Sequence, residues 1–407
     1  MTSSAPPVDP ATRLALSGPA LTLLLVSSLT VMSGATIAAS LPALEAHFGG
    51  THDVELLTRL VLTVPAAAIV VSAPVAGLLA DRVGRRPLLV LAIALFAVAG
   101  ASGLILDSLP ALLVGRAALG LAVGAIMTVA TALAGDYFAG PQRQAFMGRQ
   151  GAFTGVGGLV FITGGGLLAG LHWRAPFAIY ALALLLIPLV VTQLRNPPAP
   201  PAQSVSGGSA APTRARRDLV LLLYAGALLN SIAFYLIPTQ LPFLLAMRGV
   251  DTPFLAGLAI GLATVMSAVA SLNYRRISRA ASPRLLFAGG FALMGISYGM
   301  VASSPLFAVT LVAMAVGGAG LGLMMPAFSF TALEIAPAAS RGAIVGGLTS
   351  SIFLGQFISP FVSQPWATVF GLPSAFGTMG ILLGCLATLI VVARPVTRWL
   401  SPVKAQA

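Results

Sequence analysis

The sequence predicts an all-α polytopic membrane protein with twelve transmembrane helices in two pseudo-symmetric six-helix bundles. The first observation is composition: 57% of the 407 residues are hydrophobic and only 8% are charged, whereas soluble domains carry about 25% charged residues. The second is length, because a spanning helix needs about 20 apolar residues, and twelve such helices with short loops would use nearly the whole chain. The third is an internal repeat. A water-soluble globule is therefore excluded.

Long apolar runs between charged residues define the twelve predicted spans. They are 16–42, 54–79, 88–106, 110–134, 148–169 and 175–194 in the first half, and 218–246, 253–273, 285–303, 306–333, 343–363 and 373–393 in the second. Many contain glycine or proline, which spanning helices tolerate better than soluble helices do.

Most of the 22 basic residues gather in alternate loops and near both ends of the chain. Cytoplasmic loops of membrane proteins are enriched in Lys and Arg, so we expect both termini in the cytoplasm and a multi-pass protein of a bacterial inner (plasma) membrane. The net charge of +12 then reflects topology within the lipid bilayer. A nucleic-acid partner is not expected, and we expect a monomer.

This topology can be tested by labelling single introduced cysteines. Positions within 196–212 should react only from the cytoplasmic side, and positions 49–52 only from outside. Labelling of both regions from the same side would contradict the twelve-span topology.

Residues 195–217 form the one long polar stretch and are dominated by Pro, Ser, Gly and Arg, a composition typical of linkers. We predict a cytoplasmic linker here. It would separate an N-terminal six-helix bundle, 1–194, from a C-terminal six-helix bundle, 218–407.

The two halves resemble each other at an offset of 200 residues. Thr131-Ala132-Leu133 recurs as Thr331-Ala332-Leu333, and Gly120 is matched by Gly320. Duplicated membrane proteins commonly bind their ligand near the bilayer midplane, at the interface of the repeats.

Between the second and third spans the sequence reads Gly77-Leu-Leu-Ala-Asp81-Arg82-Val-Gly84-Arg85-Arg86. This resembles the signature loop of the major facilitator superfamily, Gly-x-Leu-x-Asp-Arg-x-Gly-Arg-Arg/Lys. An ordinary cytoplasmic loop would explain the arginines, but not Gly77, Asp81 and Gly84 at these spacings. The resemblance implies a transporter fold rather than an enzyme. It also implies that Gly77 permits close approach of helices and that Gly84 permits a tight turn.

The same resemblance implies a cytoplasmic latch. Asp81 would lie against the N-terminus of the eleventh span, after Ser340, where unpaired N–H groups and the helix dipole favour an anion. Arg85 would pair with Asp136 at the end of the fourth span. The matching loop of the second half, 275–279, places Arg275 where the acid was, so we expect the latch in one half only.

Arg116 is the one charge well inside a predicted span, and Gly120 and Gly124 follow it. This resembles the family's Arg-x-x-x-Gly element. Intramembrane charges are functional candidates by default, although Arg116 could instead extend to the outer surface. Its counterpart at the offset of 200 is Val316.

In this fold, the first, fourth, seventh and tenth spans line the substrate cavity and the eleventh flanks it. The candidate cavity residues are Ser33, Thr36, Asn230, Ser231, Phe234, Tyr235, Phe328 and Gln356. The two amides are the most informative, because an amide in hydrocarbon needs partners, but each could instead join helices. Hydroxyl groups often bond their own helix backbone. Such a cavity suits an apolar or amphipathic solute.

None of the ten acidic residues lies at mid-membrane in the predicted spans. A coupling proton is expected from the resemblance, and its carboxylate stays open among Asp53, Glu55 and Glu334 near span ends. The three histidines lack the spacing of metal ligands, and no phosphate-binding loop is present. No metal and no cofactor is therefore expected.

We expect a secondary active transporter that moves a small organic molecule outward by alternating access. The fifth span lacks the Gly-Pro typical of drug antiporters in this family, so antiport does not follow from the resemblance. The alternatives are a facilitator or importer of a small neutral solute and, from a different class, a receptor or sensor of the same fold.

Overall fold

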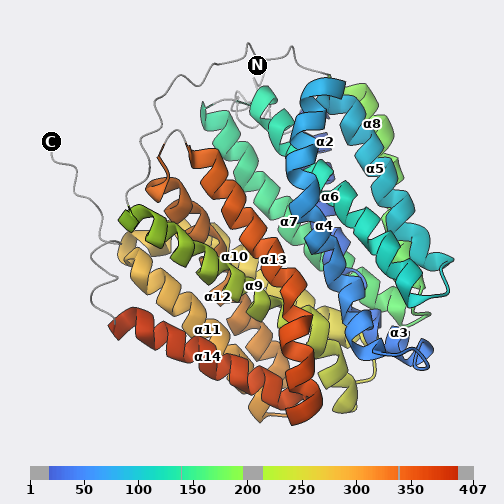
Figure 1. Ribbon diagram of the computed structural model, residues 1–407, viewed down its shortest axis with the longest axis vertical. Coiled ribbons are helices and arrows are strands. Elements are labelled where there is room, and N and C mark those ends of the chain that lie inside the picture. The colour runs from blue at the N-terminus through green and yellow to red at the C-terminus, as the bar shows by residue number, and fades with distance from the viewer. Residues whose placement is uncertain (1–17, 139, 196–213, 338–339, 393–407) are drawn as a thin grey trace, which may run out of the picture.

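The computed structural model describes residues 18–138, 140–195, 214–337 and 340–392, which form helices and no strands (Figure 1). In chain order the elements are α2 (Gly18–Ala35), η1 (Ala38–Ser40), α3 (Leu41–His47), α4 (Val54–Val83), α5 (Arg85–Ala101), η2 (Ser102–Leu104), α6 (Leu109–Tyr137), α7 (Gly140–Ala169), η3 (Ala175–Leu185), α8 (Leu186–Gln193), α9 (Arg214–Met247), α10 (Pro253–Ala280), α11 (Pro283–Ser303), α12 (Phe307–Ile335), α13 (Arg341–Phe370) and α14 (Leu372–Val392).

Twelve segments of this described part are long and apolar enough to cross a membrane, as predicted. The first span is a composite of α2, η1 and α3, and extends from Gly18 to His47. The eleventh is longer than predicted, because α13 reaches Phe370. The prediction ended it at residue 363, but α13 continues through Pro360 and Pro365, because proline inside a spanning helix does not end it when neighbouring helices satisfy the backbone.

Helices α2 to α8 pack on one another, and so do α9 to α14. The two groups meet mainly where α7 packs on α10 and α4 packs on α13. Figure 1 shows α13 approaching α4 near α3. Most of the predicted linker, 196–213, lies outside the described residues. We name the two ends of the molecule by the predicted topology: the predicted outer end carries residues 48–53, and the predicted inner end carries Gly84.

Helix contacts correct the register of the internal repeat in the fourth and tenth spans. A Cβ added to Gly120 of α6 would overlap the carbonyl oxygen of Pro65 in α4, and a Cβ added to Gly318 of α12 would overlap that of Ala263 in α10. Gly318 is therefore the structural counterpart of Gly120, and the matching of Gly120 with Gly320 was wrong by two residues. By the same register, Met314 rather than Val316 corresponds to Arg116.

The loops before α5 and α11 follow the corrected register. Gly84 precedes α5 with φ of 95°, a conformation that favours glycine, and Ser282 precedes α11. Two residues further on, Arg86 donates a hydrogen bond to the carbonyl of Val191 near the end of α8, and Arg284 donates one to the carbonyl of Val391 near the end of α14.

Asp81 therefore corresponds to Arg279, and not to Arg275 as the sequence match suggested. Short matches in alanine- and arginine-rich segments arise at several offsets, whereas the starts of α5 and α11 and the arginines that follow them both support an offset of 198. An arginine still stands where the first half has its acid.

Candidate functional site

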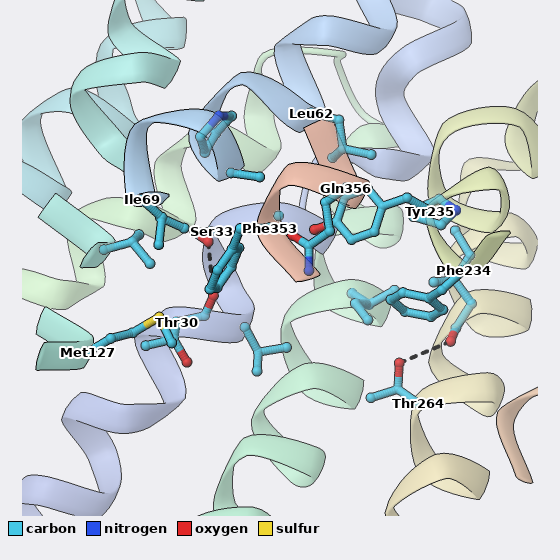
Figure 2. A pocket seen from close by; sticks show the side chains of 18 residues that line it. Thr30, Ser33, Leu62, Ile69, Met127, Phe234, Tyr235, Thr264, Phe353 and Gln356 are labelled. Atoms are coloured by element: carbon cyan, nitrogen blue, oxygen red, sulfur yellow. Dashed lines mark hydrogen bonds between the residues drawn. The ribbon is translucent and has the colours of Figure 1, made fainter. Parts of the chain in front are cut away.

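A cavity of about 320 Å³ lies between the two groups of helices (Figure 2). Side chains from α2, α4 and α6 face others from α9, α10 and α13 across it. The labelled lining residues are Thr30, Ser33, Leu62, Ile69, Met127, Phe234, Tyr235, Thr264, Phe353 and Gln356. No charged side chain is among the lining residues.

Four predicted cavity residues line this cavity: Ser33, Phe234, Tyr235 and Gln356. The Ser33 hydroxyl donates to the carbonyl of Thr30 at 2.9 Å, within its own helix. Gln356 is half-buried, and its amide bonds no other described residue. Gln356 therefore offers an amide donor and acceptor to a ligand in a wall that is otherwise mostly apolar.

The other four predicted cavity residues do not line it. Thr36 is fully buried and donates to the carbonyl of Met32 at 2.7 Å. Asn230 and Ser231 are buried one turn before Phe234 on α9. The Ser231 Cβ would lie 2.8 Å from a Cβ added to Gly355 of α13, so the close approach of α13 covers this part of α9.

Phe328 is also a correction. Its ring packs on Phe287 at 5.0 Å between centroids, and it lines a different groove, between helices of the second half. The tenth span contributes no side chain to the lining of the central cavity.

Arg116 neither lines the cavity nor extends to the outer surface, since it is only 1% exposed. Its Nε donates to the carbonyl of Val61 at 3.0 Å, and its Nη2 donates to the carbonyl of Ser33. Pro65 has no N–H, so Val61 lacks its helical donor, and Ser33 lies in the last turn of α2, where carbonyls are unpaired. Arg116 thus satisfies two backbone acceptors and joins α6 to α4 and α2.

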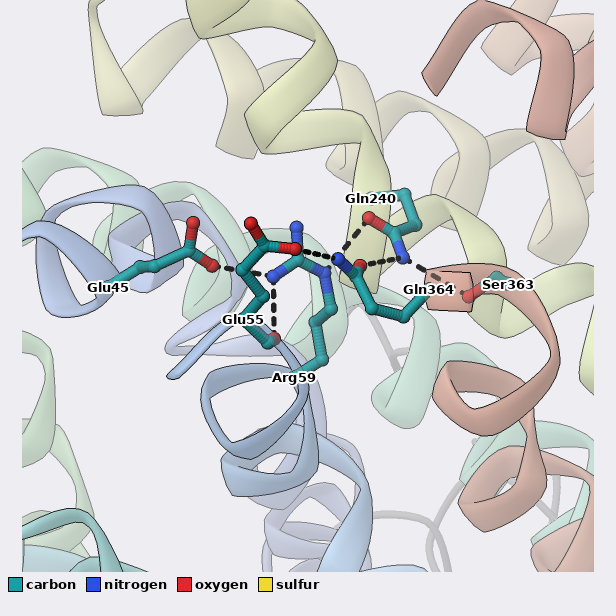
Figure 3. Close-up of polar contacts among 6 residues, drawn as sticks. All are labelled: Glu45, Glu55, Arg59, Gln240, Ser363 and Gln364. Atoms are coloured by element: carbon teal, nitrogen blue, oxygen red, sulfur yellow. Dashed lines mark hydrogen bonds and ion pairs between the residues drawn. The ribbon is translucent and has the colours of Figure 1, made fainter. Parts of the chain in front are cut away.

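A buried polar network, which the sequence analysis missed, lies at the predicted outer end (Figure 3). Arg59 of α4 is at its centre and is only 3% exposed. Its Nη1 pairs with Glu45 at 2.5 Å, and its Nε donates to Gln240 Oε1 at 3.0 Å. The guanidinium also lies over the ring of Phe243, 3.9 Å from its centroid. Arg59 therefore connects α3 and α4 to α9.

The network continues to α13. Gln240 Nε2 donates to Ser363 Oγ at 3.2 Å and to Gln364 Oε1 at 3.0 Å, and Gln364 in turn donates to the carboxylate of Glu55. We call these six residues the outer network: Glu45, Glu55, Arg59, Gln240, Ser363 and Gln364. Among the described residues, it holds the side-chain hydrogen bonds that join the two groups of helices.

Away from this network, the two groups meet through small residues. A Cβ added to Gly158 of α7 would lie 2.9 Å from Thr264 of α10, and one added to Gly155 would lie 3.0 Å from Ala268. A further hollow of about 290 Å³ lies beside the cavity toward the predicted inner end, and both are lined by Thr30 and Met127. The outer network thus joins the two groups of helices on the outer side of the cavity, whereas this hollow adjoins the cavity on its inner side.

The signature loop lies at the predicted inner end. Arg85 forms an ion pair with Asp136, the pairing that the resemblance implied. Asp81 and Arg82 are exposed, and Asp81 contacts no charged or hydrogen-bonding partner among the described residues. A Cβ added to Gly77 would meet only Thr128, at 3.8 Å, so close helix approach does not require Gly77 here. Of the two predicted latch contacts, the one between Asp81 and the start of α13 is therefore not formed among the described residues.

Within the described residues, no three His, Cys, Asp or Glu side chains gather as a metal site. The closest pair involving histidine is His52 with Asp53 at 2.7 Å, and both side chains are exposed.

Residues 23–285 match the sequence model of the major facilitator superfamily. The chain belongs to this superfamily. The efflux pump dotC of Dothistroma septosporum is 31% identical over 174 residues, which are 42% of this chain and 29% of that protein. A triacylglyceride transporter of Mycolicibacterium hassiacum is 30% identical over 286 residues, which are 67% of this chain and 49% of that one. The matched segments thus span less than half of each relative.

Among solved structures, an inward-facing, unoccupied bacterial homologue of the human lysosomal transporter Spinster has a TM-score of 0.75. It is 17% identical and covers 95% of this chain and 96% of its own, a likeness that shows the fold. Family and fold are those of transporters of the major facilitator superfamily and not of enzymes. The chain is therefore a multi-pass membrane protein.

Proposed function

We propose that this major facilitator superfamily member is a secondary transporter that moves a small apolar or amphipathic organic molecule by alternating access, in the outward direction. The observation that supports this best is the uncharged cavity between the two groups of helices, in which the Gln356 amide and the Tyr235 hydroxyl bond no other described residue. A mostly apolar pocket with few polar groups is typical of sites for small organic ligands. The outward direction is supported by the likeness to a protein named as an efflux pump.

Proton coupling is part of the proposal. Of the three acids considered from the sequence, Asp53 pairs with exposed His52 and Glu334 is exposed. Only Glu55 reaches the other half, through Gln364, and Glu45 joins it through Arg59. We assign the coupling proton to these two carboxylates, which would be uncovered whenever the predicted outer end opens.

The function can be tested in an efflux-deficient host that expresses the full chain. The protein should make the host resistant to some toxic compounds, and this resistance should be lost when the proton gradient is collapsed. The same compounds, radiolabelled, should then cross the membrane of proteoliposomes. Saturable binding without flux would instead indicate a receptor, and flux that does not depend on the proton gradient would indicate a facilitator.

Gln356→Leu should change substrate handling. The variant keeps the size of the side chain but removes its amide, so a polar substrate group would lose a hydrogen bond of about 1 kcal/mol. We expect KM to rise about fivefold for substrates that carry such a group. Asn230→Leu is the matched control: this amide is buried, unpartnered and away from the cavity. Equal effects of both variants on KM would contradict the assignment of Gln356.

Asp81→Asn should slow turnover without weakening the conformation described here, because Asp81 is exposed in it. The carboxylate would act when the inner end closes, where an anion at the start of α13 would gain roughly 0.3–1 kcal/mol, and up to about 2 when partly buried. Cysteine probes at the inner ends of α4 and α13 should therefore become more accessible. Arg279→Gln, in the corrected register of the second half, should do much less. No change in accessibility or turnover for Asp81→Asn would refute the latch.

A further inference from the structure

A second groove, of about 340 Å³, lies between helices of the second half. It is lined by one face of α9, by the first turns of α11, by α12 and by the last turns of α14: Leu219, Leu222, Leu223, Ala225, Gly226, Leu229, Arg284, Phe287, Phe291, Phe328, Thr331, Leu386, Leu389 and Ile390. It shares no lining residue with the central cavity. We call it the α9–α14 groove.

The walls of this groove face the membrane. Leu222 is 56% exposed and Leu389 is 60% exposed, and both lie in helices that span the bilayer. Apart from Arg284 and Thr331, every lining residue is apolar. A groove of this kind, open within the hydrocarbon region, accommodates an acyl chain rather than a polar solute.

One end of the groove carries positive charge. Arg284 is half-buried in the first turn of α11, and its Nε donates to the carbonyl of Ile390 at 2.7 Å. No described acid forms an ion pair with it, although the carbonyls at the end of α14 offset part of its charge. The N-terminus of α11 adds the positive end of a helix dipole.

The sequence next to these helices is also rich in arginine: Arg214, Arg216 and Arg217 begin α9 beside Asp218, and Arg394 and Arg398 follow the last residue of α14 along the chain. Clusters of Lys and Arg next to a spanning helix attract anionic lipid headgroups. The mouth of the groove is therefore complementary to an anion that carries an apolar tail.

In the described part of the chain, the first half has no equivalent groove between α2 and α8, the helices that correspond to α9 and α14. Arg86 contacts α8 as Arg284 contacts α14, but the start of α2 closes onto the end of α8. A Cβ added to Gly18 would overlap the side chain of Gln193. The groove is thus a property of the second half and not of the repeated fold.

We propose that the α9–α14 groove binds an anionic phospholipid, with one acyl chain between α9 and α14 and its phosphate at Arg284. This site is separate from transport through the central cavity. The bound lipid would fill the gap where α14 and α9 make little direct contact.

The test uses the purified full chain in detergent, titrated with phosphatidylglycerol or with phosphatidylcholine of the same acyl chains and analysed by native mass spectrometry. We expect phosphatidylglycerol to bind at least fivefold more tightly. Ala225→Trp, at an exposed lining position, should fill the groove and reduce binding of both lipids at least fivefold. Ile296→Trp, on the exposed side of α11 and outside the groove, is the matched control and should bind like the wild type.

Charge variants test the headgroup separately. Arg284→Gln should abolish the preference for phosphatidylglycerol, Arg284→Lys should retain most of it, and Arg276→Gln, an exposed arginine outside the groove, should not change it. Because Arg284 also contacts α14, melting temperatures in lipid-free detergent show whether Arg284→Gln is folded, and Ala225→Trp tests the groove without touching this contact.

Three results would overturn the proposal. Unchanged lipid binding in Ala225→Trp would place the lipid elsewhere. Absence of lipid binding in the wild type, combined with increased proteolysis of residues 393–407 in Ala225→Trp, would assign the groove to the end of the chain itself. Displacement of the lipid by inorganic phosphate alone would show that the site selects the anion and not the acyl chain, and would also refute a lipid site.

Discussion

Arg59→Gln should open the predicted outer end and reduce transport at least tenfold. Arg59 is buried, paired with Glu45 and bonded to Gln240 of the other half. Removing one partner of a buried ion pair costs up to about 3–5 kcal/mol, because the other charge is left uncompensated; Glu45 is 24% exposed, so the cost here lies toward the lower end. That exceeds or equals the few kcal/mol that separate two conformations of such a protein. Exposing Glu45 to water by opening the outer end relieves the cost.

The measurement is labelling of a cysteine at Phe353, in the wall of the cavity, by a membrane-impermeant reagent added from the predicted outer side. The exposed native Cys385 is first replaced by Ser. Labelling should be slow in the parent and at least about tenfold faster with Arg59→Gln, which corresponds to about 1.4 kcal/mol.

Arg174→Gln is the matched control. Arg174 pairs with Asp107 at the same end, but both residues belong to the first half, so this change should not alter labelling at Phe353. If Arg59→Gln leaves labelling and transport as in the parent, the outer network does not hold the predicted outer end closed.

The twelve spans and the signature loop could be predicted from the sequence because both are local. Hydropathy over about 20 residues identifies a spanning helix, and the pairing of Arg85 with Asp136 followed from the loop. The outer network could not be predicted, since its decisive bonds join residues 181 and 309 positions apart in the sequence. Glutamines at the ends of spans, such as Gln240, were the one signal that could have indicated it.

The cavity could be predicted only in part, because helical periodicity fixes a face of a helix but not the depth to which it is covered. Asn230 and Phe234 lie on the same face of α9, one turn apart. Phe234 lines the cavity, whereas Asn230 is buried, because Gly355 lets α13 approach α9 closely at that level. The packing partner, and not the residue pattern, decided which of them a substrate can reach.

The duplicated halves preserve an interaction without preserving its residues. Tyr180 of η3 donates to the carbonyl of Ser33, and Tyr298 of α11 donates to the carbonyl of Ala233. Helix α5 corresponds to α11, and the span of η3 and α8 corresponds to α14. Tyr180 packs on Phe96 of α5, with 5.7 Å between ring centroids, and Tyr298 packs on Phe376 of α14 at the same distance. The tyrosine that donates the hydrogen bond thus stands in the sixth span of the first half but in the third span of the second half, whereas the accepting carbonyl lies in the first span of each half.

The second large effect concerns Arg116, and it falls on stability. Arg116→Leu would leave the carbonyls of Val61 and Ser33, which the buried Arg116 side chain bonds, with fewer donors. An unsatisfied buried acceptor costs about 1–3 kcal/mol, so we expect a loss of about 2 kcal/mol or more, less folded protein and a lower melting temperature in detergent. Arg116→Lys should recover only part, because a point charge cannot reproduce the planar guanidinium that bonds both carbonyls.

A double variant distinguishes this role from a general need for charge. Val61 lacks a helical donor because residue 65 is proline, so Pro65→Ala returns the missing N–H to that carbonyl. Arg116→Leu should therefore destabilise the Pro65→Ala protein less than the wild type, by about 1 kcal/mol, a coupling typical of residues that share a partner. Pro74→Ala, in the same helix, supplies no N–H to a carbonyl that Arg116 bonds. Its effect should add to that of Arg116→Leu, and additivity in both pairs would show that Arg116 does not compensate for Pro65.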